Sequence, residues 1–188
     1  IKVISNAGGI NPEACRDALL EVATQLGITI RVALVKGDDL STRLNELSEV
    51  DKNEMFTGAP FPKKIESLNA YLGARPIARA LEEGAQIVIT GKCADSAVVL
   101  GPLMHEFNWA DNDYDLLAAG SLAGHIIECG AQVTGGNFTD WKQTADTWHN
   151  IGFPIVEVEI DGKFTVSKPA DTGGLVSSAT VCEQVFMN

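Results

Sequence analysis

Short apolar runs alternate with longer segments of helical periodicity along most of the chain. Three runs rich in β-branched residues predict strands at residues 1–5, 28–35 and 87–90. The last of these reads as a strand that is buried on both faces, because it carries no polar residue until Thr90. Strands that alternate with helical segments predict an α/β fold, with an open, mostly parallel sheet flanked by helices.

The helical segments carry recognisable start and stop signals. Asn11 is a natural cap with Pro12 at the first helical position, and Gly27 ends that helix. Further helices are predicted from Asp39 or Ser41 to about 47, over 63–73, over 75–83, from Asp95 or Ser96 toward Glu106, from Tyr114 to about Gly130, and from Ser177 or Ser178 onward.

Two other stretches depart from the alternation of strand and helix. The alternating runs 155–160 and 163–168 flank Asp161-Gly162, which predicts a β-hairpin near residues 155–168. Residues 131–134 predict a short strand. The segment 49–62 is polar and punctuated by Gly and Pro, so it is either a functional loop or a packed surface excursion.

Length and termini set the expected domain organisation. A chain of 188 residues is long enough for one α/β domain with a full core. The chain begins with Ile1 and strand-like sequence at once, and residues 182–188 look like a helix cut short. We therefore expect residues 1–188 to form a single domain that is a fragment of a longer chain.

Charge and hydropathy limit the possible partners. The formal net charge is −11, from 14 basic and 25 acidic residues, so a phosphate backbone would be repelled and nucleic acid is not an expected partner. No apolar run approaches the roughly 20 residues that span a bilayer, so no membrane partner is expected. The four cysteines show no paired spacing, which favours reduced thiols and a cytoplasmic protein.

Glycine-bearing turns follow the predicted strands and are the main candidates for a ligand site. In a parallel sheet such turns meet at one edge, where their N–H groups favour an anionic ligand. The alternatives are that Lys92 is merely solvated and that Asp95 only caps a helix. The candidate ligand-binding residues are Asn6, Gly8, Gly9, Lys36, Gly91, Lys92, Ser96, Gly135, Gly136 and Asn137.

A cluster of ionisable residues lies on the predicted helix 114–130. His125, Glu128 and Cys129 are spaced by three and four positions and share one helix face. They could hold a metal or form a general base with its orienting carboxylate, or His125 could be a hydrogen-bonded core residue with Cys129 packed beside it. We expect no metal site, and the candidate catalytic residues are Asp95, His125 and Glu128.

Common cofactor motifs are incomplete in this chain. No G-x-G-x-x-G occurs, and the Gly91-Lys92 turn has Gln86 where a phosphate loop needs its first glycine. The acids of 111–115 lack the glycine and glutamate that complete a calcium loop, so helix capping is the better interpretation. The cofactor is therefore left unknown.

Several segments together resemble one known family. They are Ser5-Asn-Ala-Gly-Gly-Ile-Asn-Pro, Lys36-Gly-Asp-Asp, Ala70-Tyr-Leu-Gly-Ala, the run 89–97, the long block 117–138, Lys168-Pro-Ala-Asp-Thr-Gly-Gly-Leu-Val and Thr180-Val-Cys-Glu-Gln. These segments resemble the acyclic terpene utilisation protein AtuA family, formerly a domain of unknown function, over essentially all 188 residues. The resemblance implies that this chain is part of a longer one, with a role in acyclic terpene breakdown through CoA thioesters. It also implies that members of the family commonly have Arg where this chain has Lys92.

The expected function follows from these turns and this resemblance. We expect an enzyme that acts on a small carboxylic acid or its CoA thioester, with hydratase, lyase and hydrolase as the candidate reaction types. Lys92 and the turn N–H groups would hold the anionic end, while Asp95 or His125 would move a proton. The alternatives are a non-catalytic subunit of an acyl-CoA-processing complex and a metal-dependent enzyme using His125 and Glu128. A homo-oligomer is expected.

Overall fold

The computed structural model describes residues 1–9, 11–48, 53–62 and 64–186. These residues divide into two compact units, Ile1–Ala94 and Asp95–Asn188, and each unit is described by itself. The expectation that residues 1–188 act as one domain stays a prediction.

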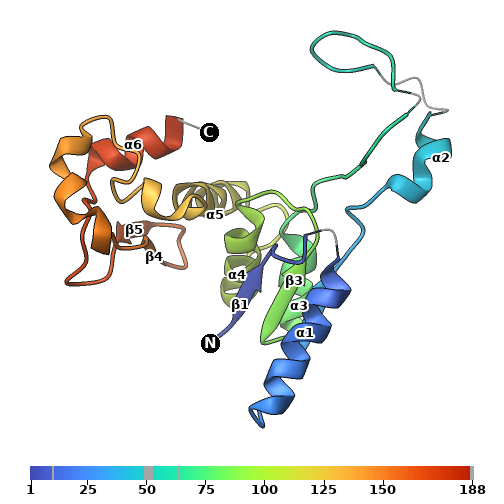
Figure 1. The fold of residues 1–188 in the computed structure, drawn as a ribbon, viewed down its shortest axis with the longest axis horizontal. Coiled ribbons are helices and arrows are strands. Elements are labelled where there is room, and N and C mark those ends of the chain that lie inside the picture. The colour runs from blue at the N-terminus through green and yellow to red at the C-terminus, as the bar shows by residue number, and fades with distance from the viewer. Residues whose placement is uncertain (10, 49–52, 63, 187–188) are drawn as a thin grey trace. The chain divides into compact units, whose positions relative to one another are not determined.

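Three parallel strands form the centre of the first unit (Figure 1). They are β1 (Val3–Ser5), β2 (Val32–Val35) and β3 (Ile87–Thr90). The sheet order is β1-β3-β2, so β3 is the middle strand and pairs in parallel with both neighbours. The predicted α/β class and parallel sheet are confirmed.

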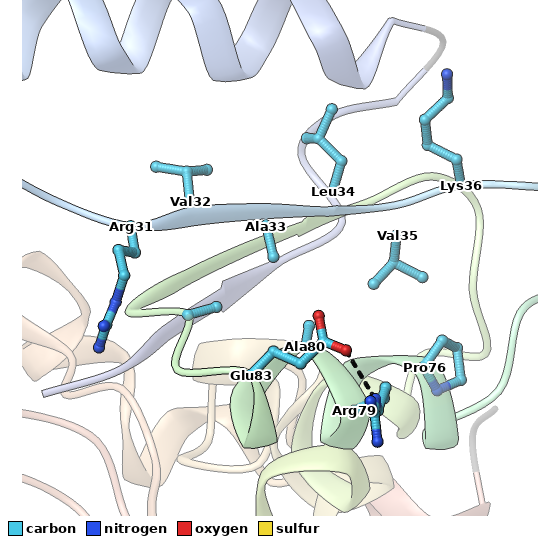
Figure 2. Close-up of a pocket in the computed structure, with 11 residues that line it drawn as sticks. Arg31, Val32, Ala33, Leu34, Val35, Lys36, Pro76, Arg79, Ala80 and Glu83 are labelled. Atoms are coloured by element: carbon cyan, nitrogen blue, oxygen red, sulfur yellow. Dashed lines mark hydrogen bonds and ion pairs between the residues drawn. The ribbon is translucent and has the colours of Figure 1, made fainter.

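Helices α1 (Pro12–Gln25) and α3 (Arg75–Glu82) pack against β2 and β3. In Figure 2, Val32 and Leu34 leave β2 on the side of α1, whereas Ala33 and Val35 leave it on the side of α3. The sheet is therefore covered on both faces, as consecutive apolar residues in its strands require. The core of this unit is contributed mainly by α3 and β3 and contains the buried residues Ile77, Ala78, Leu81, Val88 and Ile89.

The two outer strands are shorter than the apolar runs predicted. Ile1 is fully exposed and Val3 is about half exposed, at 49%, so residues 1–5 are not a buried strand throughout. The second run, 28–35, is strand only from Val32, because residues 28–31 have no neighbour in register on β3.

The connection between β2 and α3 contains little regular structure. A 3₁₀ turn, η1 (Ser41–Arg43), leads into the short helix α2 (Leu44–Ser48), as the start signals at Asp39 and Ser41 predicted. The predicted helix over 63–73 is wrong for residues 64–73, which are irregular; residue 63 and residues 49–52 lie outside the described residues.

The second unit combines three helices with one hairpin. The helices are α4 (Ala97–Phe107), α5 (Tyr114–Ile127) and α6 (Ser178–Phe186), and the strands are β4 (Ile155–Val158) and β5 (Phe164–Ser167). The hairpin is confirmed as antiparallel, with Gly162 at a positive φ of 83° in its turn. Helices α4 and α5 pack closely, because a Cβ on Gly124 would lie 2.8 Å from the Ser96 Cα.

A 3₁₀ helix, η2 (Gly130–Gln132), and the turn after it replace the strand predicted at 131–134. Two further 3₁₀ helices follow, η3 (Trp141–Gln143) and η4 (Ala145–Asn150). Positive φ angles at Gly130 and Gly135 bend the backbone at both ends of the apolar run, and the Thr134 hydroxyl donates to the carbonyl of Gly152 at 2.6 Å. The Thr134 hydroxyl also donates to the nearby Ala131 carbonyl at 3.1 Å, so a local and a long-range hydrogen bond together favour a turn over a strand.

All four cysteines are free thiols, in agreement with their unpaired spacing. None of the helices in the described part of the chain combines the length and the hydropathy that crossing a bilayer requires.

Candidate functional site

The carboxyl ends of the three parallel strands bring three turns of the first unit to one edge of the sheet. Ser5 pairs with Ile89 and Val35 pairs with Thr90, so β1, β2 and β3 end at nearly the same level. The turns that follow are Asn6–Gly9, Lys36–Asp39 and Gly91–Ala94. The predicted meeting of glycine-bearing turns is confirmed for these three.

Asp38 ties the turn after β2 to the turn after β3. It is only 7% exposed, and its Oδ2 accepts hydrogen bonds from the Lys92 backbone N–H at 2.8 Å and from Asn69 Nδ2 at 3.0 Å. A Cβ on Gly91 would lie 1.9 Å from Asp38 Oδ1, so only glycine fits there. The candidates drawn from the sequence include Lys36 and Gly91 but omit Asp38, although it lies in the same exit turn.

An extended segment, residues 69–72, joins the same two turns. The Ala70 N–H donates to the Asp38 carbonyl at 2.8 Å, and the Leu72 N–H donates to the Lys92 carbonyl at 3.0 Å. Leu72 in turn accepts from the N–H of Ala94 at 2.9 Å. These bonds to distant turns explain why the segment is not the helix that its sequence predicts.

A polar hollow of about 460 Å³ opens between these turns. Its lining consists of amide, hydroxyl, carboxylate and ammonium groups with one phenol ring, from Asn6, Gly9, Asp38, Ser67, Asn69, Tyr71 and Lys92. The Lys92 ammonium lies 5.0 Å from the centre of the Tyr71 ring, within the range of a cation–π contact. The hollow therefore offers a cation, hydrogen-bond donors and an aromatic face to a small ligand.

The turn after β1 needs glycine for close packing. A Cβ on Gly8 would lie 2.7 Å from Ile89 Cγ2 and 2.9 Å from the Pro12 Cβ, and Gly9 has a positive φ of 49°. Asn11 caps α1 as predicted, since its Oδ1 accepts from the Ala14 N–H at 3.0 Å. The glycines thus place the start of α1 beside the polar hollow.

Lys36 lies apart from the other predicted ligand-binding residues of this unit. Its ammonium pairs with the Glu13 carboxylate, and this hydrogen bond holds the pKa of Glu13 below its ordinary value. Lys36 lines a different hollow along β2 and is not part of the lining of the polar one. The structure therefore does not bring Lys36 together with Lys92.

The remaining candidates belong to the second unit. Ser96 occupies the N-cap position of α4, but its side chain makes no capping hydrogen bond, and the neighbouring Asp95 is exposed. Their expected roles in ligand binding and proton transfer stay predictions.

His125 and Glu128 form the pair that their spacing predicts. His125 Nδ1 lies 3.2 Å from Glu128 Oε1, and both side chains are largely covered, with 27% and 13% exposed. His125 Nε2 lies 3.3 Å from the Val185 carbonyl of α6, and Gln184 Nε2 donates to the His125 carbonyl at 3.2 Å. This geometry suits a general base with an orienting carboxylate, and it equally suits a structural hydrogen-bond link between α5 and α6.

The fourth predicted glycine turn, 135–137, follows the 3₁₀ helix η2 rather than a strand. The Gly135 carbonyl accepts from the Thr144 hydroxyl at 3.0 Å, and a Cβ on Gly136 would lie 2.8 Å from the Ala131 carbonyl oxygen. A shallow hollow of about 450 Å³ is lined here by Gly136, Asn137, Phe138, Trp141 and Trp148. Gly136 and Asn137 thus line an aromatic hollow of the second unit, whereas Gly135 is buried.

No group of three or more His, Cys, Asp or Glu side chains within the described ranges is arranged to hold a metal ion. The pair of His125 and Glu128 accordingly gains no third ligand from these residues.

A parallel sheet covered by helices, with a polar hollow at the carboxyl edge of its strands, places the first unit in the open-sheet α/β class. The chain belongs to the acyclic terpene utilisation protein AtuA family, whose model matches residues 1–187. No curated protein and no solved structure gave a significant match to this chain.

Proposed function

We propose that this chain is an enzyme of small-acid or acyl-CoA catabolism, of the acyclic terpene utilisation type, that binds the carboxylate or thioester end of its substrate in the polar hollow. The observation that carries this proposal is the position of Lys92 beside Asn6 and Asn69 at the carboxyl edge of the sheet. Family membership supports involvement in acyclic terpene utilisation.

The electrostatics of the hollow favour an anionic or strongly polar head group. The whole chain carries a net charge of −11, so an anion needs a local cation, and Lys92 supplies one. The Asp38 carboxylate already accepts two hydrogen bonds, from Lys92 N–H and Asn69, which offsets its repulsion of a ligand anion. The amides of Asn6 and Asn69 can orient a carbonyl or carboxylate oxygen.

A hydratase, lyase or hydrolase also needs a group that takes or gives a proton. His125, whose Nδ1 lies 3.2 Å from Glu128 Oε1, and exposed Asp95 are the two candidates for this role in the proposal.

Isothermal titration of the full chain with short branched acids and their CoA thioesters tests the binding step. We expect Lys92→Ala to weaken binding at least tenfold, because the ammonium is the cation of the hollow. Lys64→Ala is the matched control, since the Lys64 side chain is 91% exposed and lies outside the lining. Equal affinities for the Lys92 and Lys64 variants would contradict the proposal.

A non-catalytic subunit of an acyl-CoA-processing complex is the second candidate, and one surface favours it. Met55 and Phe56 are 84% and 86% exposed at the tip of a turn. The Glu54 carboxylate accepts a hydrogen bond from the N–H of Phe56 at 3.0 Å, which stabilises this turn. Tight association with an acyl-CoA carboxylase, without turnover by the chain alone, would favour the subunit over the enzyme.

A further inference from the structure

A groove of about 430 Å³ follows β2 along the side that faces away from β3 (Figure 2). Its floor is formed by residues 31–36, and one wall is formed by Pro76, Arg79, Ala80 and Glu83 of helix α3 and its end. Strand β2 is last in the sheet order, so no described strand pairs with this side. The groove therefore exposes the backbone of an edge strand.

The hydrogen-bond register shows which backbone groups face the groove. The Ile87 N–H donates to the Arg31 carbonyl at 3.1 Å, and the Gly91 N–H donates to the Val35 carbonyl at 3.0 Å. In a parallel pair, alternate residues direct both N–H and C=O toward the partner strand. The N–H and C=O groups of Val32 and Leu34 consequently point into the groove, where an added strand can pair with them.

The side chains around the groove suit an apolar strand. Val32 and Leu34 lie on one side of the strand, and Ala33 and Val35 lie on the other beside Ala80 (Figure 2). A strand added to this edge would therefore meet apolar side chains on both of its faces. Consecutive β-branched or apolar residues are the kind that fill such a position.

The charged residues at the ends of the groove indicate which flanking residues an added strand should have. Arg31 and Lys36 bracket β2, and the lining holds three basic residues against one acidic residue in a chain that is strongly acidic overall. Arg79 is already paired with Glu83 at 2.9 Å, and Lys36 is shared with Glu13. The ends of the groove thus favour carboxylates that flank the added strand.

A second copy of this chain would bring no acid to these ends. In an antiparallel pair of two β2 strands with Val32 opposite Leu34, Arg31 of one copy would lie opposite Val35 of the other, and Lys36 opposite residue 30. A partner with acids at these positions complements the two basic residues.

We propose that the outer edge of β2 is a docking site for an extended segment of another protein, with about four apolar or β-branched residues between two acids. The segment adds to β2 as a fourth strand of the sheet, and its backbone pairs with Val32 and Leu34. This site is distinct from the polar hollow and does not depend on the function proposed for it.

Blocked six-residue peptides test the proposal on the full, isotopically labelled chain. One peptide has glutamate at both ends of four alternating valine and threonine residues, and the matched peptide has lysine at both ends. We expect the glutamate peptide to slow amide exchange of Val32 and Leu34 at least tenfold at saturation and to leave Ala33 and Val35 unchanged. The lysine peptide is expected to bind at least tenfold more weakly than the glutamate peptide. In the Arg31→Glu variant, the difference in affinity between the two peptides should be smaller.

Two N-methylated glutamate peptides keep the test independent of protein variants. Methylation of the alternate amides that face β2 should reduce affinity at least tenfold, whereas methylation of the other set should not. Equal effects of the two methylations, or equal binding of the two charge patterns, would overturn the proposal. Amides of Val32 and Leu34 that are protected without peptide, or only at high protein concentration, would overturn it by showing an edge covered by the chain itself or by a second copy.

Discussion

Gly91 is restricted to glycine by a contact and not by its backbone conformation. A Cβ there would lie 1.9 Å from Asp38 Oδ1, and the carboxylate is held by two hydrogen bonds. We expect Gly91→Ala to lower the free energy of unfolding by about 1–3 kcal/mol, as overpacking commonly does, and to weaken ligand binding in the polar hollow.

Gly73→Ala is the matched control for this variant. A Cβ at Gly73 would meet no described atom within 4 Å, and the residue does not have a positive φ. Its unfolding midpoint in urea should equal or slightly exceed that of the parent chain. Similar losses of stability in both variants would show that Asp38 moves aside easily.

The Glu54 carboxylate makes the tip that carries Met55 and Phe56 sensitive to pH. Hydrogen bonds from Thr57, and then from the Phe56 backbone, hold the pKa of Glu54 below its ordinary value of 4.5. Because the pKa is lowered in the folded turn, the stabilisation is present above 4.5 and is lost as pH falls through the lower value. The amide shifts of Phe56 and Thr57 should titrate with a midpoint below 4.5, and Glu54→Gln should remove that transition.

At the scale of elements, the start of α1 depends on one side chain. Asn11 Oδ1 accepts from the Ala14 N–H, which would otherwise lack an intrahelical partner. We expect Asn11→Ala to cost about 1 kcal/mol in the free energy of unfolding, measured by urea denaturation. Asn11→Asp keeps the acceptor and should stay close to the parent, so an equal loss in both variants would argue against capping.

The elements that the sequence predicts correctly are those with local signals. Asn11 with Pro12 and Asp161 with Gly162 determine their helix start and hairpin turn within a few residues. The helix predicted over 63–73 is wrong for residues 64–73, and the strand predicted at 131–134 is wrong, because long-range hydrogen bonds decide both segments. The N–H of Ala70 pairs with the turn after β2, and the Thr134 hydroxyl pairs with Gly152.

At the scale of the whole molecule, net charge should govern how stability responds to salt. With a net charge of −11, self-repulsion at pH 7 opposes the compact state and is screened as ionic strength rises. If screening contributes about 1 kcal/mol, the melting temperature of the full chain should rise by about 2–4 °C between 10 and 200 mM sodium chloride at pH 7. A decrease would mean that attractive surface pairs, such as Arg79 with Glu83, outweigh the repulsion.

The candidate site could be predicted from the sequence only where its residues lie in turns that directly follow parallel strands. Turns that follow parallel strands meet at one edge whatever the sheet order, so Asn6, Gly91 and Lys92 could be grouped from sequence. Asn69 and Tyr71 could not, because they reach the hollow through a segment whose path depends on bonds to distant turns. Lys36 and Lys92 line different hollows, since position in a turn does not fix the direction of a long side chain.

Asp38 accepts a hydrogen bond from the main-chain N–H of Lys92, whereas the lysine side chain contacts the solvent and the Tyr71 ring. The backbone contact that holds the turn and the side chain that faces the hollow are therefore independent of each other at Lys92. An exchange of lysine for arginine at this position would leave the hydrogen bond between Asp38 and the main chain in place. For the binding role proposed for the hollow, such an exchange would change the cationic group that meets the acid while the turn keeps its shape.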